Sequence, residues 1–141
     1  DSTHTGFNNG SANTLAAATN ATSGYTITYY GDTLTSGGNS IDAMAAKTTS
    51  STGTEQFGIN LKSNATPSTG ADPSGGSGAA KSDYNTADQF RYIVNTTTDL
   101  ASASAASAST TYTVSYITNV AATTEAGNYS TTITYICTGN F

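Results

Sequence analysis

The sequence predicts an all-β fold, specifically an immunoglobulin-like antiparallel β-sandwich of about seven strands. Three observations predict it: a two-residue alternation of apolar and polar side chains in several segments, turn-forming residues between them, and a composition rich in threonine and tyrosine. Alternation with this period puts one face of a strand in the core and the other in solvent. Threonine and tyrosine both favour such half-covered, pleated surfaces.

The alternation is clearest in the C-terminal region, around which the rest of the domain must pack. Over 111–120 the inward side chains are Tyr112, Val114, Tyr116 and Val120. Over 129–138 they are Tyr129, Ile133, Tyr135 and Cys137. Between these runs, Gly127 and Asn128 admit a positive φ, and the hydroxyl of Tyr129 can lock the corner through a backbone hydrogen bond.

Four earlier segments are predicted to be strands. The first, 11–21, is a weak edge strand that contains Leu15. The other three run over 24–30, 56–62 and 89–94, and their inward side chains are Tyr25, Ile27, Tyr29, Phe57, Ile59, Leu61, Phe90, Tyr92 and Val94. Gly31 and Asp32, which follow the second segment, predict a two-residue hairpin turn.

Three segments between these strands are less regular. Segment 42–47 predicts either one helical turn capped by Asp42 or a loop that buries Met44. Segment 63–88 is rich in proline and glycine and predicts a long surface loop. Segment 95–109 consists largely of Thr, Ala and Ser, and this low complexity predicts a flexible outer connection.

The length of 141 residues suits one domain. We divide it into an N-terminal extension or exchanged strand over 1–21 and a single sandwich over 22–141, with the long loop at 63–88. Residues 1–10 have no apolar period, and such a terminal segment is predicted to be disordered or to lie along a partner.

Composition and charge restrict the partners. Charged residues make up 9% of the chain, the formal net charge is −5, and there are only four Lys and Arg residues. Affinity for nucleic acid depends mostly on cations that neutralise phosphates, so nucleic acid and anionic membranes are poor partners. Ser and Thr make up about a third of the chain, which is typical of exported proteins, and no apolar run is long enough to span a bilayer. We therefore expect an extracellular, cell-surface protein whose signal peptide has been removed.

Candidate catalytic residues are scarce. The sole histidine, His4, lies in the least regular segment, and Cys137 is predicted to be a buried, inert thiol. No acidic pair with the spacing of a glycosidase is present, so we expect neither an enzyme nor a cofactor site. Asp83, Asn85 and Asp88 form a weak calcium candidate, and capping of turns by these side chains is the favoured interpretation.

Five Asn-x-Ser/Thr sequences mark possible glycosylation sites. They lie at Asn9, Asn20, Asn64, Asn95 and Asn128. With so much Ser and Thr in the chain, about this number arises by chance, so the sequences alone do not predict modification. The nine Tyr residues mostly alternate inward on strands, which favours a core role over sugar stacking.

Three segments carry a resemblance to a known family: 19–27, 53–61, and 126–129 continuing through 139–141, together with the loop around 71–76. They resemble a family of Thr-rich, pilin-like secreted surface domains that we associate with ultra-small bacteria of the Patescibacteria type. The resemblance implies a β-sandwich and carries no catalytic residues. Relatives place a further alternating strand before the segment that matches 19–27, and residues 1–10 do not provide one.

A sandwich that lacks its first strand exposes an apolar groove and unpaired backbone groups. We therefore expect an extracellular structural subunit that assembles with identical subunits into a filament or another surface layer by strand exchange or complementation. The residues expected to carry assembly are Phe7, Leu15 and Ala17. The alternative is a monomeric or anchored adhesin whose 63–88 loop or Thr-rich face binds a host cell or a glycan.

Overall fold

A computed structural model describes residues 13–141, and within this range the fold is all-β. Every strand pair is antiparallel, and no residue of the described range is helical. The described range accordingly contains no helix that could cross a membrane. The predicted all-β, antiparallel sandwich-like fold is therefore confirmed, whereas the immunoglobulin-like connectivity remains a prediction.

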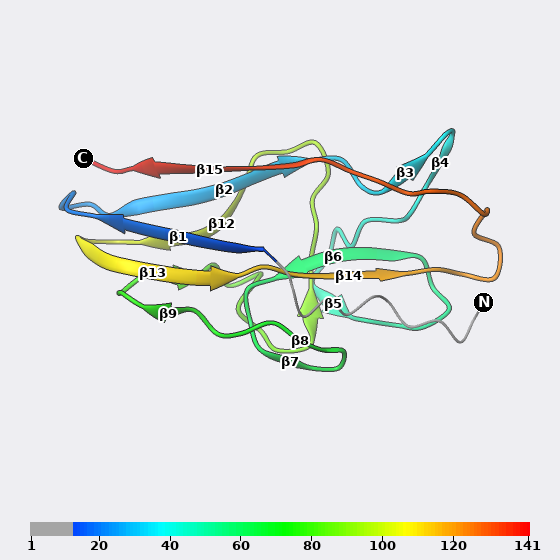
Figure 1. Ribbon diagram of the computed structural model, residues 1–141, viewed down its shortest axis with the longest axis horizontal. Helices are drawn as coiled ribbons and strands as arrows, with labels where there is room; N and C mark the ends of the chain where they lie inside the picture. Colours follow the sequence, from blue (N-terminus) through cyan, green and yellow to red (C-terminus); the bar gives the residue numbers. More distant parts are fainter. Residues whose placement is uncertain (1–12) are drawn as a thin grey trace.

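The fifteen strands of the described range fall into two groups by length (Figure 1). Seven contain five residues or more: β1 (Thr14–Thr19), β2 (Tyr25–Gly31), β6 (Gln56–Asn60), β12 (Thr98–Ala103), β13 (Ser107–Thr113), β14 (Ser115–Asn119) and β15 (Ile133–Gly139). The other eight contain two residues each: β3 (Thr35–Ser36), β4 (Asn39–Ser40), β5 (Thr48–Thr49), β7 (Asn64–Ala65), β8 (Ser68–Thr69), β9 (Ser74–Gly75), β10 (Ala79–Ala80) and β11 (Gln89–Phe90).

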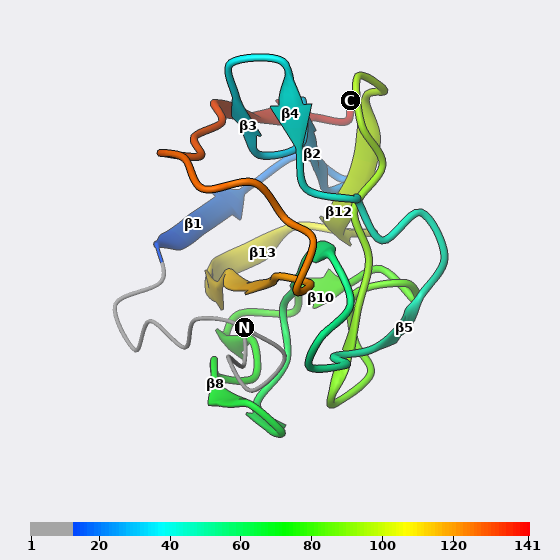
Figure 2. The ribbon, with the colours of Figure 1, turned by 90° about the vertical axis from the view of Figure 1, so that its right-hand side faces the viewer.

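Two layers face each other across the core (Figure 2). One layer is the four-stranded sheet β10-β12-β2-β15. The other contains the sheet β1-β13-β9, and its wall continues where β14 follows β13 after Val114 and pairs with β6. The strands β15, β1 and β14 each lack a neighbour on one side within the described residues, and residues of β14 and β15 line one groove.

Tyrosines join the two layers through the core. The hydroxyls of Tyr25 on β2 and Tyr112 on β13 are 2.8 Å apart, and those of Tyr29 and Tyr84 are also 2.8 Å apart. All four side chains are at most 1% exposed. Each of these four hydroxyls thus has a partner, and these tyrosines add apolar area to the core without a large desolvation penalty. This confirms that these tyrosines are core residues.

A second, smaller cluster of buried residues lies on the outer face of β6 and β14, away from the main core. It consists of Met44, Phe90 and Ile117, which are all buried. The backbone of Met44 bonds to Phe57 and Tyr92, so segment 43–45 is a loop that buries Met44, and not a helical turn. Because this cluster covers the outer face of β6 while the main core covers the inner face, all five residues of β6 are buried.

Two local predictions around the strands are wrong. No hairpin turn occurs at Gly31 and Asp32, because Gly31 still belongs to β2 and the hairpin forms later, between β3 and β4. Val94 is exposed instead of inward, because β11 ends at Phe90 and the chain turns at Asn95, whose φ is 51°.

The prediction of a flexible connection over 95–109 is also wrong. Most of this segment forms β12 and the start of β13, and β12 is a central strand between β10 and β2. Leu100 and Ala101 are fully buried and Ala103 is 3% exposed. Small side chains hid the alternation, because alanine fits a core position without being strongly apolar.

The 63–88 loop is held on both layers. Its strand β9 pairs with β13, and its strand β10 pairs with β12. Gly78 lies so close to the tyrosine pair of the core that a Cβ there would be 2.0 Å from the Tyr112 hydroxyl. The glycine at this position therefore permits a close approach to the core and does not serve flexibility.

The C-terminal region is partly as expected. The hydroxyl of Tyr129 donates to the carbonyl of Glu125 at 3.0 Å, which confirms the predicted lock of the corner. However, β14 and β15 lie in different layers, and Cys137 is exposed, so the prediction of a buried thiol is wrong. Cys137 shares the inward face with Tyr135, but β15 is an edge strand whose end the other layer does not cover.

Candidate functional site

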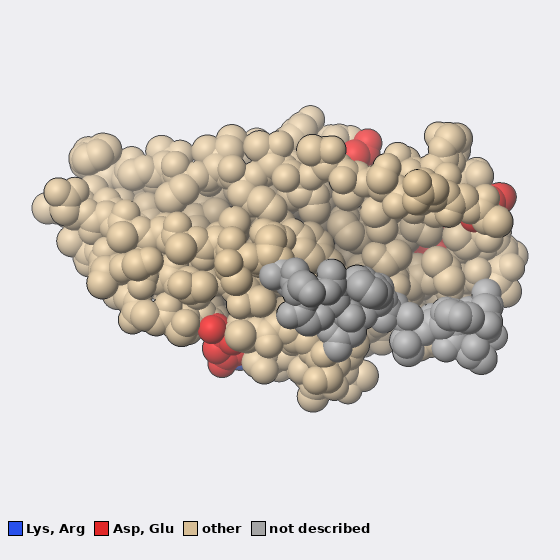
Figure 3. All heavy atoms as spheres, in the orientation of Figure 1, with Lys and Arg blue, Asp and Glu red and all other residues tan. Residues whose placement is uncertain are grey.

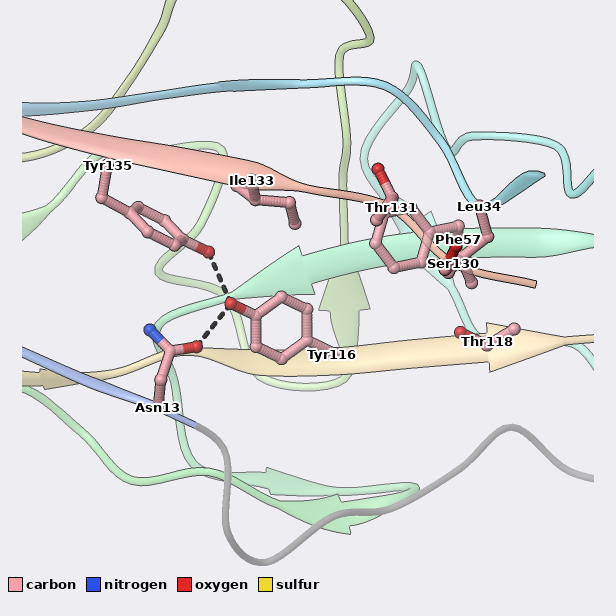
Figure 4. A pocket seen from close by; sticks show the side chains of 9 residues that line it. All are labelled: Asn13, Leu34, Phe57, Tyr116, Thr118, Ser130, Thr131, Ile133 and Tyr135. Atoms are coloured by element: carbon pink, nitrogen blue, oxygen red, sulfur yellow. Dashed lines mark hydrogen bonds between the residues drawn. The ribbon is translucent and has the colours of Figure 1, made fainter. Parts of the chain in front are cut away.

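The candidate site is an apolar groove between the free edges of the two layers. It has a volume of about 650 Å³. Its lining residues come from five segments of the chain (Figure 4): Asn13, Leu34, Phe57, Tyr116, Thr118, Ser130, Thr131, Ile133 and Tyr135. Such an arrangement of apolar side chains with a few hydroxyls suits an extended polypeptide better than a charged ligand.

The upper wall of the groove is β15. This strand pairs with β2 in a continuous register from Ile133–Gly31 to Gly139–Tyr25. The amide of Asn140 donates to the carbonyl of Gly24, so the even-numbered residues of β15 direct their backbone groups to β2. The backbone amides and carbonyls of the odd-numbered residues Ile133 and Tyr135 point away from β2. Within residues 13–141 no strand lies on that side.

The lower wall is β14, and the same reasoning identifies its free edge. Ile59 of β6 exchanges both of its backbone hydrogen bonds with Arg91. Ile59 and the residue opposite it on β14, Tyr116, therefore form a non-hydrogen-bonded pair. Ser115, Ile117 and Asn119 therefore bond to β6. Tyr116 and Thr118 direct their backbone groups to the groove side, where the described part of the chain supplies no strand.

A chain of hydroxyls bridges the two walls. The hydroxyls of Tyr116 and Tyr135 are 2.6 Å apart, and Tyr116 donates to Oδ1 of Asn13 (Figure 4). Because the Tyr116 proton points at Asn13, Tyr135 must be the donor to Tyr116. Burial raises the pKa of both tyrosines, and for Tyr135 the charge of a neighbouring Tyr116 phenolate would raise the pKa further. Both hydroxyls thus stay neutral and serve as hydrogen-bonding groups.

The apolar floor and the far end of the groove are held in place by the backbone. Phe57 is 3% exposed, whereas Leu34 and Ile133 are partly buried. Ser130 and Thr35 exchange two backbone hydrogen bonds of 3.0 Å, and the hydroxyl of Thr131 donates to the carbonyl of Asp32 at 2.7 Å. These bonds tie the segment before β15 to Asp32 and to Thr35 of β3, so the groove is largely preformed.

The surface around the groove carries few charges. The space-filling view of this face shows only scattered acidic side chains and almost no basic ones (Figure 3). Three cations of the chain are paired elsewhere with aspartates: Lys62 with Asp72, Lys81 with Asp99, and Arg91 with Asp83. The pKa of the exposed Asp72 carboxyl is lowered by its hydrogen bonds from Lys62 and the Ser63 amide. The groove therefore favours a neutral, apolar occupant.

The residues expected to carry assembly lie on the N-terminal strand. Leu15 and Ala17 belong to β1, which pairs with β13 of the same chain; Ala17 is buried and Leu15 packs against the core. Thus β1 is part of the sandwich in this structure, and the predicted domain boundary at residue 22 falls after one of its strands. Phe7 lies outside the described residues.

The three calcium candidates do not converge. Asp83 pairs with Arg91, and Oδ1 of Asp88 accepts the amides of Ala65 and Thr66, both at 2.7 Å. Asn85 accepts only a long bond of 3.5 Å from Thr86. Within the described residues no three His, Cys, Asp or Glu side chains form a group suited to a metal. Asp88, with a φ of 61°, acts as a turn-capping residue instead.

The possible glycosylation sites differ in accessibility. Asn20, Asn95 and Asn128 are exposed, whereas Asn9 and the sole histidine His4 lie outside the described residues. Asn64 is 7% exposed, and its amide bonds to the carbonyls of Lys62 and Thr69 and to Asn60. A glycan at Asn64 would require this network to open, so Asn64 is not an acceptor in the folded domain.

Sequence reasoning missed most of the groove. It assigned Tyr116 and Tyr135 to the core and gave no role to Asn13 or Leu34. The available signal was that two strands of the C-terminal region had to end at sheet edges, which alternation alone does not reveal. Comparison of the chain with protein-family models, curated protein sequences and solved structures found no match.

Proposed function

We propose that this chain is a structural subunit that assembles with identical copies into a filament or other layer on the outer cell surface, by exchange of its N-terminal strand. The observation that carries the proposal is the apolar groove between the free edges of β14 and β15. Unpaired backbone groups beside an apolar floor form a site for an added strand.

The N-terminal strand β1 is suited to exchange. It lies at the edge of its sheet, and its first residue follows Asn13 at the mouth of the groove. A short turn joins it to β2 in the opposite layer, closed by a bond of 3.1 Å from the Gly24 amide to the Ala21 carbonyl. If this turn opened, β1 of one copy would make the same contacts in the next. Such a contact, when it does not close a ring, propagates as a filament.

The proposed location outside the cell is argued from the composition of the protein's own surface. The described surface presents mainly hydroxyl and amide groups, and the whole chain carries only thirteen charged residues, counted as four Lys and Arg plus nine Asp and Glu. The resemblance to Thr-rich secreted surface domains supports the same location. We propose a structural and not a catalytic role, because the groove offers neutral hydroxyls and no acid, base or nucleophile in contact.

Electron microscopy of the full chain at high concentration tests the proposal, with two variants of β15. Ile133→Glu puts a charge into the groove, whereas Thr134→Glu puts the same charge on the exposed outer face of the same strand. We expect filaments or layers from the parent chain and from Thr134→Glu, and folded monomers, checked by circular dichroism, from Ile133→Glu. Monomers of all three that bind a glycan array would instead favour the adhesin.

A further inference from the structure

We propose that two copies of this chain pair through the free edges of their β15 strands, which run antiparallel about a two-fold axis at Ile136. The four-stranded sheets of the two copies then form one continuous sheet. This contact goes beyond the proposed exchange of β1. Exchange restores the pairing of β1 with β13 and leaves the free edge of β15 uncovered within residues 13–141, so β15 is available for a second contact between copies.

The edge of β15 lacks the features that keep sheet edges from pairing. The strand has seven residues, carries no charged side chain or proline, and keeps one continuous register with β2. At the opposite edge of the same sheet, β10 has only two residues and is followed by Lys81. The edge strand β1 contains a register shift between Ala17 and Thr19. Long, uncharged and regular edges readily add a further strand, so β15 is the edge best suited to pairing.

The free backbone groups of β15 restrict the register. Its even-numbered residues bond to β2, so the amides and carbonyls of its odd-numbered residues are free. Two antiparallel copies of the strand overlap over their full length when the axis passes through Ile136. Ile133 is then opposite Gly139 of the second copy, and Tyr135 is opposite Cys137 of the second copy. Each of these pairs joins two odd-numbered residues and can therefore exchange two backbone hydrogen bonds.

The outer face of β15 is complementary to itself in this register. Ile136 meets Ile136 of the second copy, and Thr134 meets Thr138 of the second copy. Ile136 is 51% exposed, and its diagonal neighbour on β2, Tyr30, is 45% exposed, so the free subunit leaves apolar area on this face. Cross-strand threonines can bond to each other, and facing isoleucines remove apolar area from water. This symmetry of the side chains identifies a second copy as the partner.

The C-terminal residue adds a contact on the inner face. Phe141 is fully exposed, and its ring lies 3.4 Å from the position that a Cβ of Gly139 would take. Ile133 of the second copy is opposite Gly139 and would therefore pack against this ring. In the free subunit Ile133 lines the open groove and is only partly buried. The pairing thus covers apolar side chains on both faces of β15.

Cysteine substitutions test the position of the axis. In a Cys137→Ser background, Ile136→Cys places two thiols opposite each other, with Cα atoms about 4.5 Å apart, which suits a disulfide. The matched control is Thr134→Cys on the same outer face. Its two copies would be four residues apart along the strand, or about 13 Å, which is too far for a disulfide. If Ile136→Cys disturbs the fold, a mixture of Thr134→Cys and Thr138→Cys chains supplies a second in-register pair.

Non-reducing gel electrophoresis after addition of oxidised glutathione measures the rate of dimer formation. We expect the in-register thiols to form covalent dimers about tenfold faster than the Thr134→Cys control does. Equal rates, or faster linkage in the control, would overturn the inference. The proposed function fails separately, if the in-register dimers form as expected but electron microscopy of the parent chain shows no filament or layer. Filaments or layers without a difference in rate would contradict only the inference.

Discussion

The hydroxyls of Tyr116 on β14 and Tyr135 on β15 lie 2.6 Å apart and join the two layers at the mouth of the groove. Tyr116 also donates to Asn13, so it stands between two partners, whereas Tyr135 has one. Removing the Tyr116 hydroxyl would break both hydrogen bonds, whereas removing the Tyr135 hydroxyl would break one and leave Tyr116 paired with Asn13.

We therefore predict that Tyr116→Phe destabilises the domain more than Tyr135→Phe does. The expected losses in the free energy of unfolding are about 2 kcal/mol and about 1 kcal/mol respectively, because Tyr116→Phe removes two hydrogen bonds and Tyr135→Phe removes one, each with a net value of about 1 kcal/mol. Urea denaturation followed by circular dichroism measures both. A larger effect of Tyr135→Phe would contradict the hydrogen-bond directions assigned to this bridge.

Leu100 tests whether segment 95–109 forms a core strand. Its side chain is fully buried in β12, so Leu100→Ala should lower the free energy of unfolding by about 2 to 5 kcal/mol through lost burial and an unfilled cavity. The exposed Ala105 lies in the same low-complexity segment, and Ala105→Ser should change stability by less than about 0.5 kcal/mol. Similar small effects at both positions would mean that the segment is the flexible connection first expected from its composition.

Gly78 tests the packing of the long loop against the core. A Cβ at this position would meet the hydroxyls of Tyr112 and Tyr25 at 2.0 and 2.2 Å, so Gly78→Ala should destabilise the domain by about 1 to 3 kcal/mol. Gly38, in the turn between β3 and β4, has open space around it. Gly38→Ala should therefore be close to neutral in thermal unfolding. A neutral Gly78→Ala would show that the loop does not contact the tyrosine pair.

The buried tyrosines predict a loss of stability in alkali. Burial raises the pKa of Tyr84, Tyr92, Tyr112, Tyr116 and Tyr135 above the ordinary value near 10. Above this pH the unfolded chain binds fewer protons than the folded one, so the free energy of unfolding falls as pH rises. Below a pH of about 10 the folded and the unfolded chain both keep these protons, so these tyrosines make their full contribution to the free energy of unfolding.

Absorbance of tyrosinate, recorded alongside circular dichroism, checks this dependence. We expect the signal from these five residues to appear only together with unfolding. Complete ionisation of all nine tyrosines while the strand signal persists would contradict their burial.

The fold was predictable where large apolar side chains alternate. Tyr25, Ile27 and Tyr29 identified β2, and Phe57 and Ile59 identified β6, because each large residue marks an inward position. The method failed where the inward residues are small, as in β12, and where a residue such as Cys137 faces inward at an uncovered edge. Alternation reports which face a side chain takes, and it does not report whether another layer covers that face.

The groove was predictable only in outline. The reasoning that a strand was missing from the sandwich led to an exposed groove. The structure contains a groove between two free edges, but the N-terminal strand β1 is present in the sandwich, beside β13. Its lining residues depend on which strands become edges, which is set by pairings such as that of β15 with β2, over a hundred residues apart in the chain. Single-sequence patterns carry no signal for such long-range pairings.

The most direct test of strand exchange uses two populations of the chain, both carrying Cys137→Ser. One population carries Ala16→Cys and the other carries Thr111→Cys, two exposed residues that face each other across β1 and β13, so a disulfide between these positions can form only between copies. After the mixture has assembled and been oxidised, strand exchange predicts covalent dimers that join one variant to the other through residues 16 and 111. If the populations stay unlinked while a chain that carries both cysteines closes the bond internally, the N-terminal strand remains in its own subunit and the central claim is contradicted.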